Sequence, residues 1–137
     1  MMELRKMKRR TVLKSIAAAL GAVLFWPARA ARAGKLAIGM DKLEKLKDVG
    51  SSMTIKLKGR MVMFIRDAED SVSGFDPTCT HQQCTVEHKA GSDKIECPCH
   101  GSIYDLEGNV LKGPAETALH RFETSLEDGR VVINLEE

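Results

Sequence analysis

Cysteine and histidine gather in one stretch of this chain. All four cysteines and two of the four histidines lie in two segments, CTHQQC at residues 79–84 and CPCHGSIY at residues 97–104. Each segment offers a close pair, Cys79-Thr-His81 and then Cys97-Pro-Cys-His100, with fifteen residues between His81 and Cys97. Thiolates and imidazoles are preferred ligands of transition metals. The spacing therefore predicts a metal centre that is held by two loops.

The first 33 residues have the composition of an export signal. They carry eight Lys or Arg, one acidic residue and an apolar run over residues 16–26. The run is shorter than the ~20 residues of a membrane-spanning helix, and the sequence ARAARA at residues 28–33 fits a signal-peptidase site. The pair Arg9-Arg10 resembles a twin-arginine signal. We expect a helical signal that exports the domain to the periplasmic side and is either cleaved or retained as a membrane anchor.

Two kinds of centre fit the cysteines and histidines of an exported domain. Neighbouring thiols tend to oxidise outside the cytoplasm, so one pair of cysteines is expected to join the histidines as ligands and the other to form a disulfide. A zinc ion is one candidate, but its paired ligands are usually separated by about two to four residues, whereas one residue separates Cys79 from His81. The other candidate is a [2Fe–2S] cluster with two thiolates on one iron and two imidazoles on the other.

Short strands with frequent turns are predicted to position these residues. Residues 34–137 carry 13 basic and 18 acidic residues, and this acidic balance argues against nucleic-acid binding. Alternation at Met53, Ile55 and Leu57 is typical of a half-buried strand. Further strands are expected at residues 61–65, 72–75, 85–88, 94–96, 119–126 and 130–135. The pattern predicts an all-β antiparallel sandwich or barrel.

The expected domain organisation has three parts. Residues 1–33 form the signal or anchor, and residues 34–50 form a linker or edge segment. Residues 51–137 form the β domain, in which residues 76–116 bind the metal centre.

The two motifs resemble those of a known family. C-x-H, fifteen residues and C-x-x-H is similar to the Rieske [2Fe–2S] pattern, and CTHxxC with CPCHGSxYD resembles the iron–sulfur subunit of cytochrome bc and bf complexes. The resemblance covers about residues 50–135 and implies one [2Fe–2S] cluster in a two-loop subdomain. Its implied ligands are Cys79 and Cys97 on one iron and His81 and His100 on the other, with Cys84 and Cys99 as the disulfide.

The resemblance also implies roles around the cluster. Ser102 would donate a hydrogen bond to a bridging sulfide and Tyr104 to a ligand cysteine sulfur, beneath a covering loop, Gly113-Pro114-Ala115. Gln82 and Gln83 depart from the family, which usually has a bulky apolar residue and a glycine at this docking tip.

The implied function is electron transfer at high potential. Neutral imidazoles in place of two thiolates raise the potential, and hydrogen bonds to the cluster raise it further. Because His81 and His100 can exchange a ring proton, electron and proton uptake are coupled. We expect a membrane-associated subunit, rather than an enzyme alone, that passes electrons from a quinol to cytochrome b-type and c-type partners. The alternative is the small Rieske subunit of an exported molybdenum oxidoreductase such as arsenite oxidase.

Overall fold

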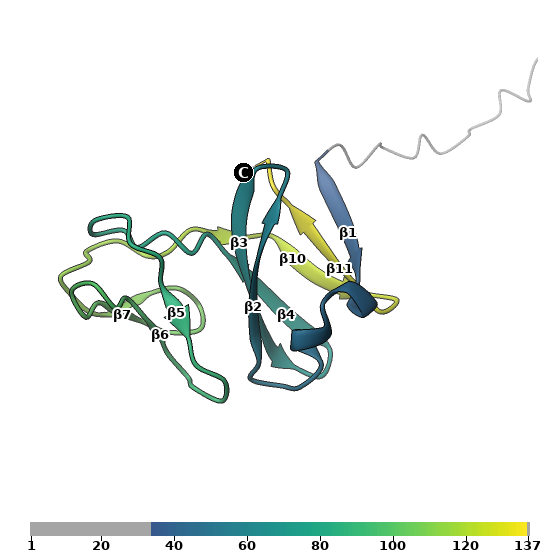
Figure 1. Ribbon diagram of the computed structural model, residues 1–137, viewed down its shortest axis with the longest axis horizontal. Coiled ribbons are helices and arrows are strands. Elements are labelled where there is room, and N and C mark those ends of the chain that lie inside the picture. The colour runs from purple at the N-terminus through teal and green to yellow at the C-terminus, as the bar shows by residue number, and fades with distance from the viewer. Residues whose placement is uncertain (1–33, 137) are drawn as a thin grey trace, which may run out of the picture. The chain divides into compact units, whose positions relative to one another are not determined.

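The computed structural model describes residues 34–136, which form an all-β structure of three antiparallel sheets (Figure 1). The predicted all-β antiparallel fold is confirmed, while the predicted export signal lies outside the described residues. The strands are β1 (Lys35–Gly39), β2 (Ser52–Leu57), β3 (Arg60–Ala68), β4 (Ser71–Phe75), β5 (Glu87–His88), β6 (Ile95–Glu96), β7 (Ile103–Tyr104), β8 (Val110–Lys112), β9 (Arg121–Phe122), β10 (Thr124–Glu127) and β11 (Arg130–Asn134). Residues 34–136 contain no helix with the length and hydropathy needed to span a membrane.

Two of the sheets form a base. Their strand orders are β1-β11-β10 and β2-β3-β4-β9, and buried side chains such as Phe64, Phe122 and Ile133 fill the core between them. Gly74 of β4 lies within this core, where an added Cβ would come within 2.8 Å of Thr124 Cγ2. Glycine therefore allows β4 and β10 to approach closely.

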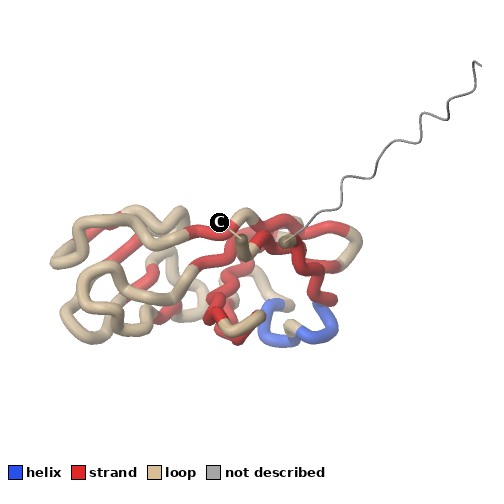
Figure 2. Tube along the Cα trace, turned by 90° about the horizontal axis from the view of Figure 1, so that it is seen from above, coloured by secondary structure: helices blue, strands red, loops and turns tan. Residues whose placement is uncertain are grey.

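Residues 34–50 contribute to this base. Strand β1 pairs with β11 from Lys35↔Asn134 to Gly39↔Arg130. Two 3-10 turns follow, η1 (Met40–Lys42) and η2 (Glu44–Leu46). They bury Leu43 and Leu46 in the core, and Figure 2 shows them in blue beside the strands of the base.

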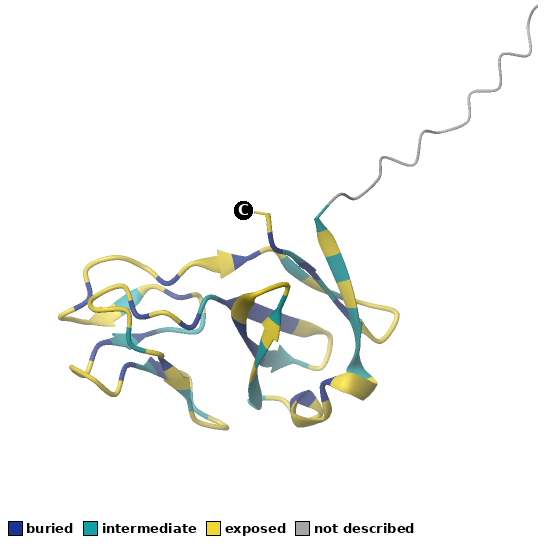
Figure 3. Ribbon diagram, turned by 45° about the horizontal axis from the view of Figure 1, so that its top comes forward, coloured by how far each residue is buried: buried dark blue, intermediate teal, exposed yellow. Residues whose placement is uncertain are grey.

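The third sheet, in the order β5-β6-β7-β8, belongs to a subdomain built largely of loops. Figure 2 shows the loops in tan, and Figure 3 shows that many of their residues are exposed. These strands are two or three residues long, too short to be stable alone. They share a core with Met63 and Ile65 of β3, whose neighbours Val62 and Phe64 face the base core. Strand β3 is thus buried on both faces, as its apolar run predicts.

Hydrogen bonds fasten this subdomain to the base. The N–H of Gly91, at the tip of the β5–β6 hairpin, donates to the carbonyl of Gly50 over 2.9 Å. The hydroxyl of Ser52 donates to the carbonyl of His88 over 3.1 Å. Gly50 has a φ of 82°, and a Cβ on it would come within 3.2 Å of Gly91 Cα, so glycine suits this contact.

The prediction of one continuous strand at residues 119–126 is wrong. It is divided into β9, which pairs with β4, and β10, which pairs with β11. Glu123 lies between them, and its carbonyl accepts a hydrogen bond from the N–H of Asn134. The chain passes from one sheet to the other here, and side-chain alternation alone does not reveal such a transfer.

Candidate metal centre

Two loops of equal length carry the cysteines and histidines. In loop 1, residues 79–84, the N–H of Cys79 donates to the carbonyl of Cys84 over 2.7 Å, and the N–H of Gln83 donates to the carbonyl of Cys79 over 2.9 Å. Loop 2, residues 97–102, repeats this pattern. Its bonds run from Cys97 N–H to the Ser102 carbonyl (2.8 Å) and from Gly101 N–H to the Cys97 carbonyl (3.0 Å). Each loop is therefore a closed turn that fixes its own first cysteine.

The four predicted ligands gather at these loops, with thiols inside and imidazoles outside. Cys79 and Cys97 are free thiols, and their residues are 1% and 2% exposed. His81 and His100 are both exposed, and their rings meet edge to face with centroids 4.9 Å apart and an interplanar angle of 89°. A centre bound here would be anchored by buried sulfur and covered by imidazoles at the surface.

The environment prepares one of the thiols to ionise. Burial raises the pKa of the Cys79 thiol, but hydrogen bonds from the Tyr104 hydroxyl and the N–H of His81 outweigh it and hold the pKa below its ordinary value. Burial and the hydrogen bond with Cys79 raise the pKa of Cys97. Since the thiolate is the form that binds a metal, the hydrogen bonds to Cys79 favour its ligand form.

A disulfide joins the two loops. Cys84 and Cys99 are bonded with an S–S distance of 2.05 Å and a Cα–Cα distance of 6.4 Å, which confirms the predicted pairing. The Sγ atoms of Cys84, Cys97 and Cys99 all lie within 4.8 Å of one another. Sulfurs bonded to each other do not act as thiolate ligands, so we interpret this proximity as a covalent link beside the site and not as a second metal site.

The side chain of Tyr104 contacts the Cys79 thiol from within the core. It is fully buried, its hydroxyl lies 3.3 Å from Cys79 Sγ, and burial together with the neighbouring thiol raises its pKa. The hydroxyl therefore keeps a proton that it can donate to sulfur, and its predicted role as a donor to the Cys79 sulfur stays a prediction.

Thr80 extends this contact, although the sequence analysis assigned it no role. Its Oγ1 lies 3.1 Å from the Tyr104 hydroxyl and donates to the carbonyl of Thr117 over 2.7 Å. Thr80 thus links loop 1 to the segment after the covering loop. The sequence feature that could have indicated this role is the hydroxyl residue between the cysteine and the histidine of the first motif.

Ser102 connects loop 2 to the covering loop. Its buried Oγ accepts a hydrogen bond from the N–H of Ala115 over 3.0 Å, which leaves the hydroxyl proton available to a further acceptor. The preceding bond, Gly113-Pro114, is cis. Ala115 is buried while Gly113 and Pro114 are exposed.

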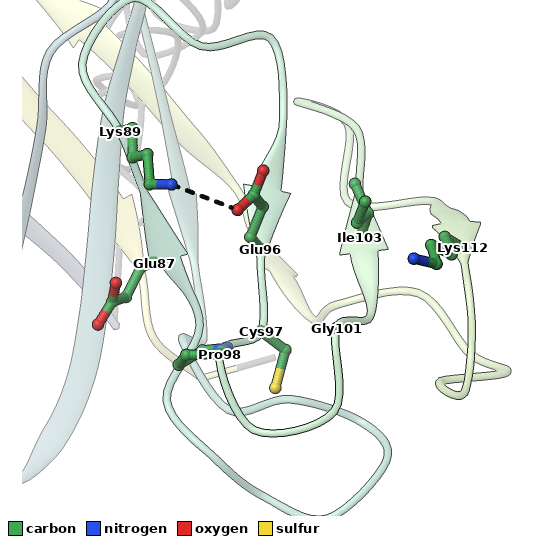
Figure 4. Close-up of a pocket in the computed structure, with 8 residues that line it drawn as sticks. All are labelled: Glu87, Lys89, Glu96, Cys97, Pro98, Gly101, Ile103 and Lys112. Carbon is green, nitrogen blue, oxygen red and sulfur yellow. Dashed lines mark ion pairs between the residues drawn. The ribbon is translucent and has the colours of Figure 1, made fainter.

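A hollow of about 270 Å³ lies beside the centre (Figure 4). Glu87, Glu96, Ile103 and Lys112 form one row across the small sheet and line the hollow together with Cys97. Neither His81 nor His100 lines it, so among the candidate ligands only Cys97 borders this hollow.

Comparison with known protein families decides the identity of this fold. Residues 39–123, more than half of the chain, match the model of the Rieske [2Fe-2S] domain. The chain belongs to the Rieske [2Fe-2S] domain family. A Rieske domain with this Cys and His set binds a single [2Fe–2S] cluster. The residues fit that group because two free, buried thiols and two imidazoles in mutual contact lie on two loops that a disulfide joins.

The relatives with high similarity are iron–sulfur subunits. The chain is 39% identical over 85 residues to a cytochrome b6-f complex iron-sulfur subunit of Prochlorococcus marinus, covering 61% of this chain and 48% of the relative. It is 34% identical over 120 residues to the chloroplastic subunit of Oryza sativa, covering 79% and 53%. The chain spans about half the length of these curated relatives.

A solved structure is also similar. The crystal structure of the plasma membrane Rieske protein from Synechocystis PCC 6803 aligns with a TM-score of 0.58 and 27% identity. The alignment covers 72% of this chain and 98% of that one. It agrees with the Rieske-type fold that the sequence predicts.

We predict that Tyr104→Phe and Ser102→Ala lower the reduction potential of the cluster without removing it. Each variant loses one hydroxyl donor, and the donors favour the more negative, reduced state. A net hydrogen bond is worth about 1 kcal/mol, so we expect a shift on the order of 50 mV for each variant. A redox titration followed by electron paramagnetic resonance measures it. Unshifted potentials in both variants would show that these hydroxyls do not point at the cluster or its ligands.

We further predict different defects for the two classes of cysteine. Cys97→Ser should abolish the visible absorption of the cluster, because it removes a ligand. Cys84→Ser should keep the ligands but assemble a weakly held cluster, because the disulfide closes a loop of fifteen residues and such a link is worth about 3 kcal/mol. Iron content and thermal unfolding distinguish these outcomes. Full cluster occupancy with unchanged stability in Cys84→Ser would contradict the role of the disulfide.

Proposed function

We propose that this Rieske domain carries electrons at high potential from a quinol to a cytochrome, as a subunit of a bc-type quinol-oxidising complex. The observation that carries the proposal is the exposure of His81 and His100 above two buried thiols. The names of the relatives support it, since they are subunits of the cytochrome b6-f complex.

The residues of the chain have distinct tasks in this proposal. Cys79 and Cys97 bind one iron, and His81 and His100 bind the other. The bound cluster supplies a one-electron acceptor and donor. The imidazoles reach the surface, so a ring nitrogen that does not bind iron can exchange a proton with water or with a docked quinol. Electron and proton are thus accepted at the same exposed edge.

The surrounding residues set the potential and limit movement. Tyr104 and Ser102 donate hydrogen bonds that stabilise the reduced state. The Cys84–Cys99 disulfide holds the two loops together. The hydrogen bond from Ala115 holds the covering loop to loop 2, and the one from Thr80 holds the following segment to loop 1. A firmly held site changes little in structure when its charge changes.

The same proposal includes location and domain organisation. Residues 1–33 would export the domain to the periplasmic side and then be cleaved or retained as an anchor, followed by the segment 34–50 and the cluster-binding domain 51–137. The disulfide supports this location, because such bonds persist in oxidising compartments.

The proposed function predicts rapid exchange with two probes. Oxidised full-length protein is mixed with a water-soluble quinol, reduced protein is mixed with an oxidised c-type cytochrome, and cluster absorbance is followed by stopped flow. We expect the quinol to reduce most of the clusters and the cytochrome to reoxidise them, while the Cys97→Ser variant, without a cluster, shows neither change. A cluster that stays oxidised in excess quinol would contradict the quinol assignment and favour another donor, such as a molybdenum enzyme.

A further inference from the structure

Three of the four cysteine sulfurs form one group. The Sγ atoms of Cys84, Cys97 and Cys99 all lie within 4.8 Å of one another, although only Cys84 and Cys99 are bonded to each other. Cys97 is a free thiol and is 2% exposed. Cys79, the other free thiol, does not belong to this group. A free thiol thus lies beside both sulfurs of a disulfide, which is the arrangement from which thiol–disulfide exchange proceeds.

The exchange needs neither an oxidant nor an external reductant. The Cys97 sulfur attacks Sγ of Cys84 as a thiolate, so that a Cys84–Cys97 bond forms while the Cys84–Cys99 bond breaks. The electron pair of the broken bond leaves with the Cys99 sulfur, which takes up the proton that Cys97 has lost. One disulfide and one thiol are present before the step and after it.

The surroundings of the two bonded cysteines favour attack at Cys84. Cys99 is exposed, whereas Cys84 is half-buried. Because water stabilises a thiolate and a stabilised thiolate leaves faster, Cys99 is the better leaving group. Attack at Cys84 also keeps loop 1 linked to loop 2, since Cys97 and Cys99 both belong to loop 2. Attack at Cys99 would join two residues that are separated only by Pro98 and would leave the loops unlinked.

Iron and Cys84 would compete for the same sulfur. The thiolate form of cysteine is both the nucleophile of disulfide exchange and the ligand of a metal. A Cys97 sulfur that binds iron is therefore withdrawn from attack on the disulfide. A Cys97 sulfur that is bonded to Cys84 is in turn lost as a ligand.

We propose that Cys97 bonds either to the iron of the cluster or to Cys84, so that the bound cluster protects the Cys84–Cys99 disulfide and loss of the cluster transfers the bond to Cys84–Cys97. The transfer removes one ligand and leaves an exposed thiol at Cys99. A chain that has lost its cluster is thus prevented from binding another until the exchange is reversed. This inference goes beyond electron transfer, and it rests on the ligand role proposed for Cys97.

Two ligand variants of the full-length protein test whether the position of Cys97 matters. Cys79→Ser and Cys97→Ser each lose one proposed ligand and keep one free thiol beside the disulfide. Each is purified anaerobically without added thiol, labelled with a maleimide while folded, and mapped by mass spectrometry. In Cys79→Ser we expect a Cys84–Cys97 bond and a label on Cys99, with labelling at least about tenfold faster than in Cys97→Ser. In Cys97→Ser the Cys84–Cys99 bond should persist.

The wild-type holoprotein provides a second measurement that needs no substitution. A chelator removes iron anaerobically from the full-length protein while the visible absorption of the cluster is followed. Samples are acidified at intervals, which protonates the thiols and stops exchange before the disulfide is mapped. We expect only the Cys84–Cys99 bond before the chelator is added, and a Cys84–Cys97 bond that increases as the absorption falls.

The disulfide maps decide the outcome. A Cys84–Cys99 bond that persists after the cluster is lost, or a Cys97–Cys99 bond in its place, overturns the inference. A disulfide that also moves in Cys97→Ser overturns it as well, because exchange would then not depend on Cys97. These results leave the proposed electron transfer standing, since the quinol and cytochrome reactions test it separately. A Cys97→Ser variant that keeps the cluster absorption contradicts the ligand role and this inference together.

Discussion

The covalent link between Cys84 and Cys99 is the constraint on which the rest of the site depends. The small sheet that carries the two loops has strands of two or three residues, and such strands contribute little stability alone. The disulfide joins loop 1 and loop 2 covalently, so that the two loops form one structural unit. It leaves the other two cysteines as free thiols beneath the surface.

Hydrogen bonds also hold the two loops and the neighbouring segments in place. Each loop closes on its own first cysteine through backbone bonds, and Tyr104 approaches the thiol of Cys79 from the core. Ser102 attaches the covering loop to loop 2, and Thr80 attaches the segment after the covering loop to loop 1. The Tyr104 contact also affects the charge that the site favours, because a hydroxyl that donates toward Cys79 Sγ stabilises the thiolate.

Much of this arrangement could be predicted from the sequence, because the spacing of cysteine and histidine is a strong signal. The all-β fold, the single cluster and the pairing of Cys84 with Cys99 are confirmed, and the candidate ligands lie together as their roles require. Those roles stay predictions, as do the export signal and the domain limits.

Other features have no signal in local patterns. Strands β7 and β8 are too short to show alternation, and the break at Glu123 arises because the chain changes sheets. The left-handed conformation of Gln83 is visible only in the backbone, since glutamine by itself predicts no such turn. The role of Thr80 depends on Thr117, thirty-seven residues away, and it needs the tertiary structure to be seen.

A redox titration of the holoprotein at several pH values, followed by visible absorption and electron paramagnetic resonance, tests the central claim most directly. The proposed ligand set, two exposed imidazoles above two buried thiolates, predicts a one-electron potential of roughly +100 to +300 mV. They also predict that the potential falls at alkaline pH by up to about 59 mV per unit, since reduction would then bring a proton onto an imidazole. A potential near about −150 mV, or one that does not change with pH, would contradict this account.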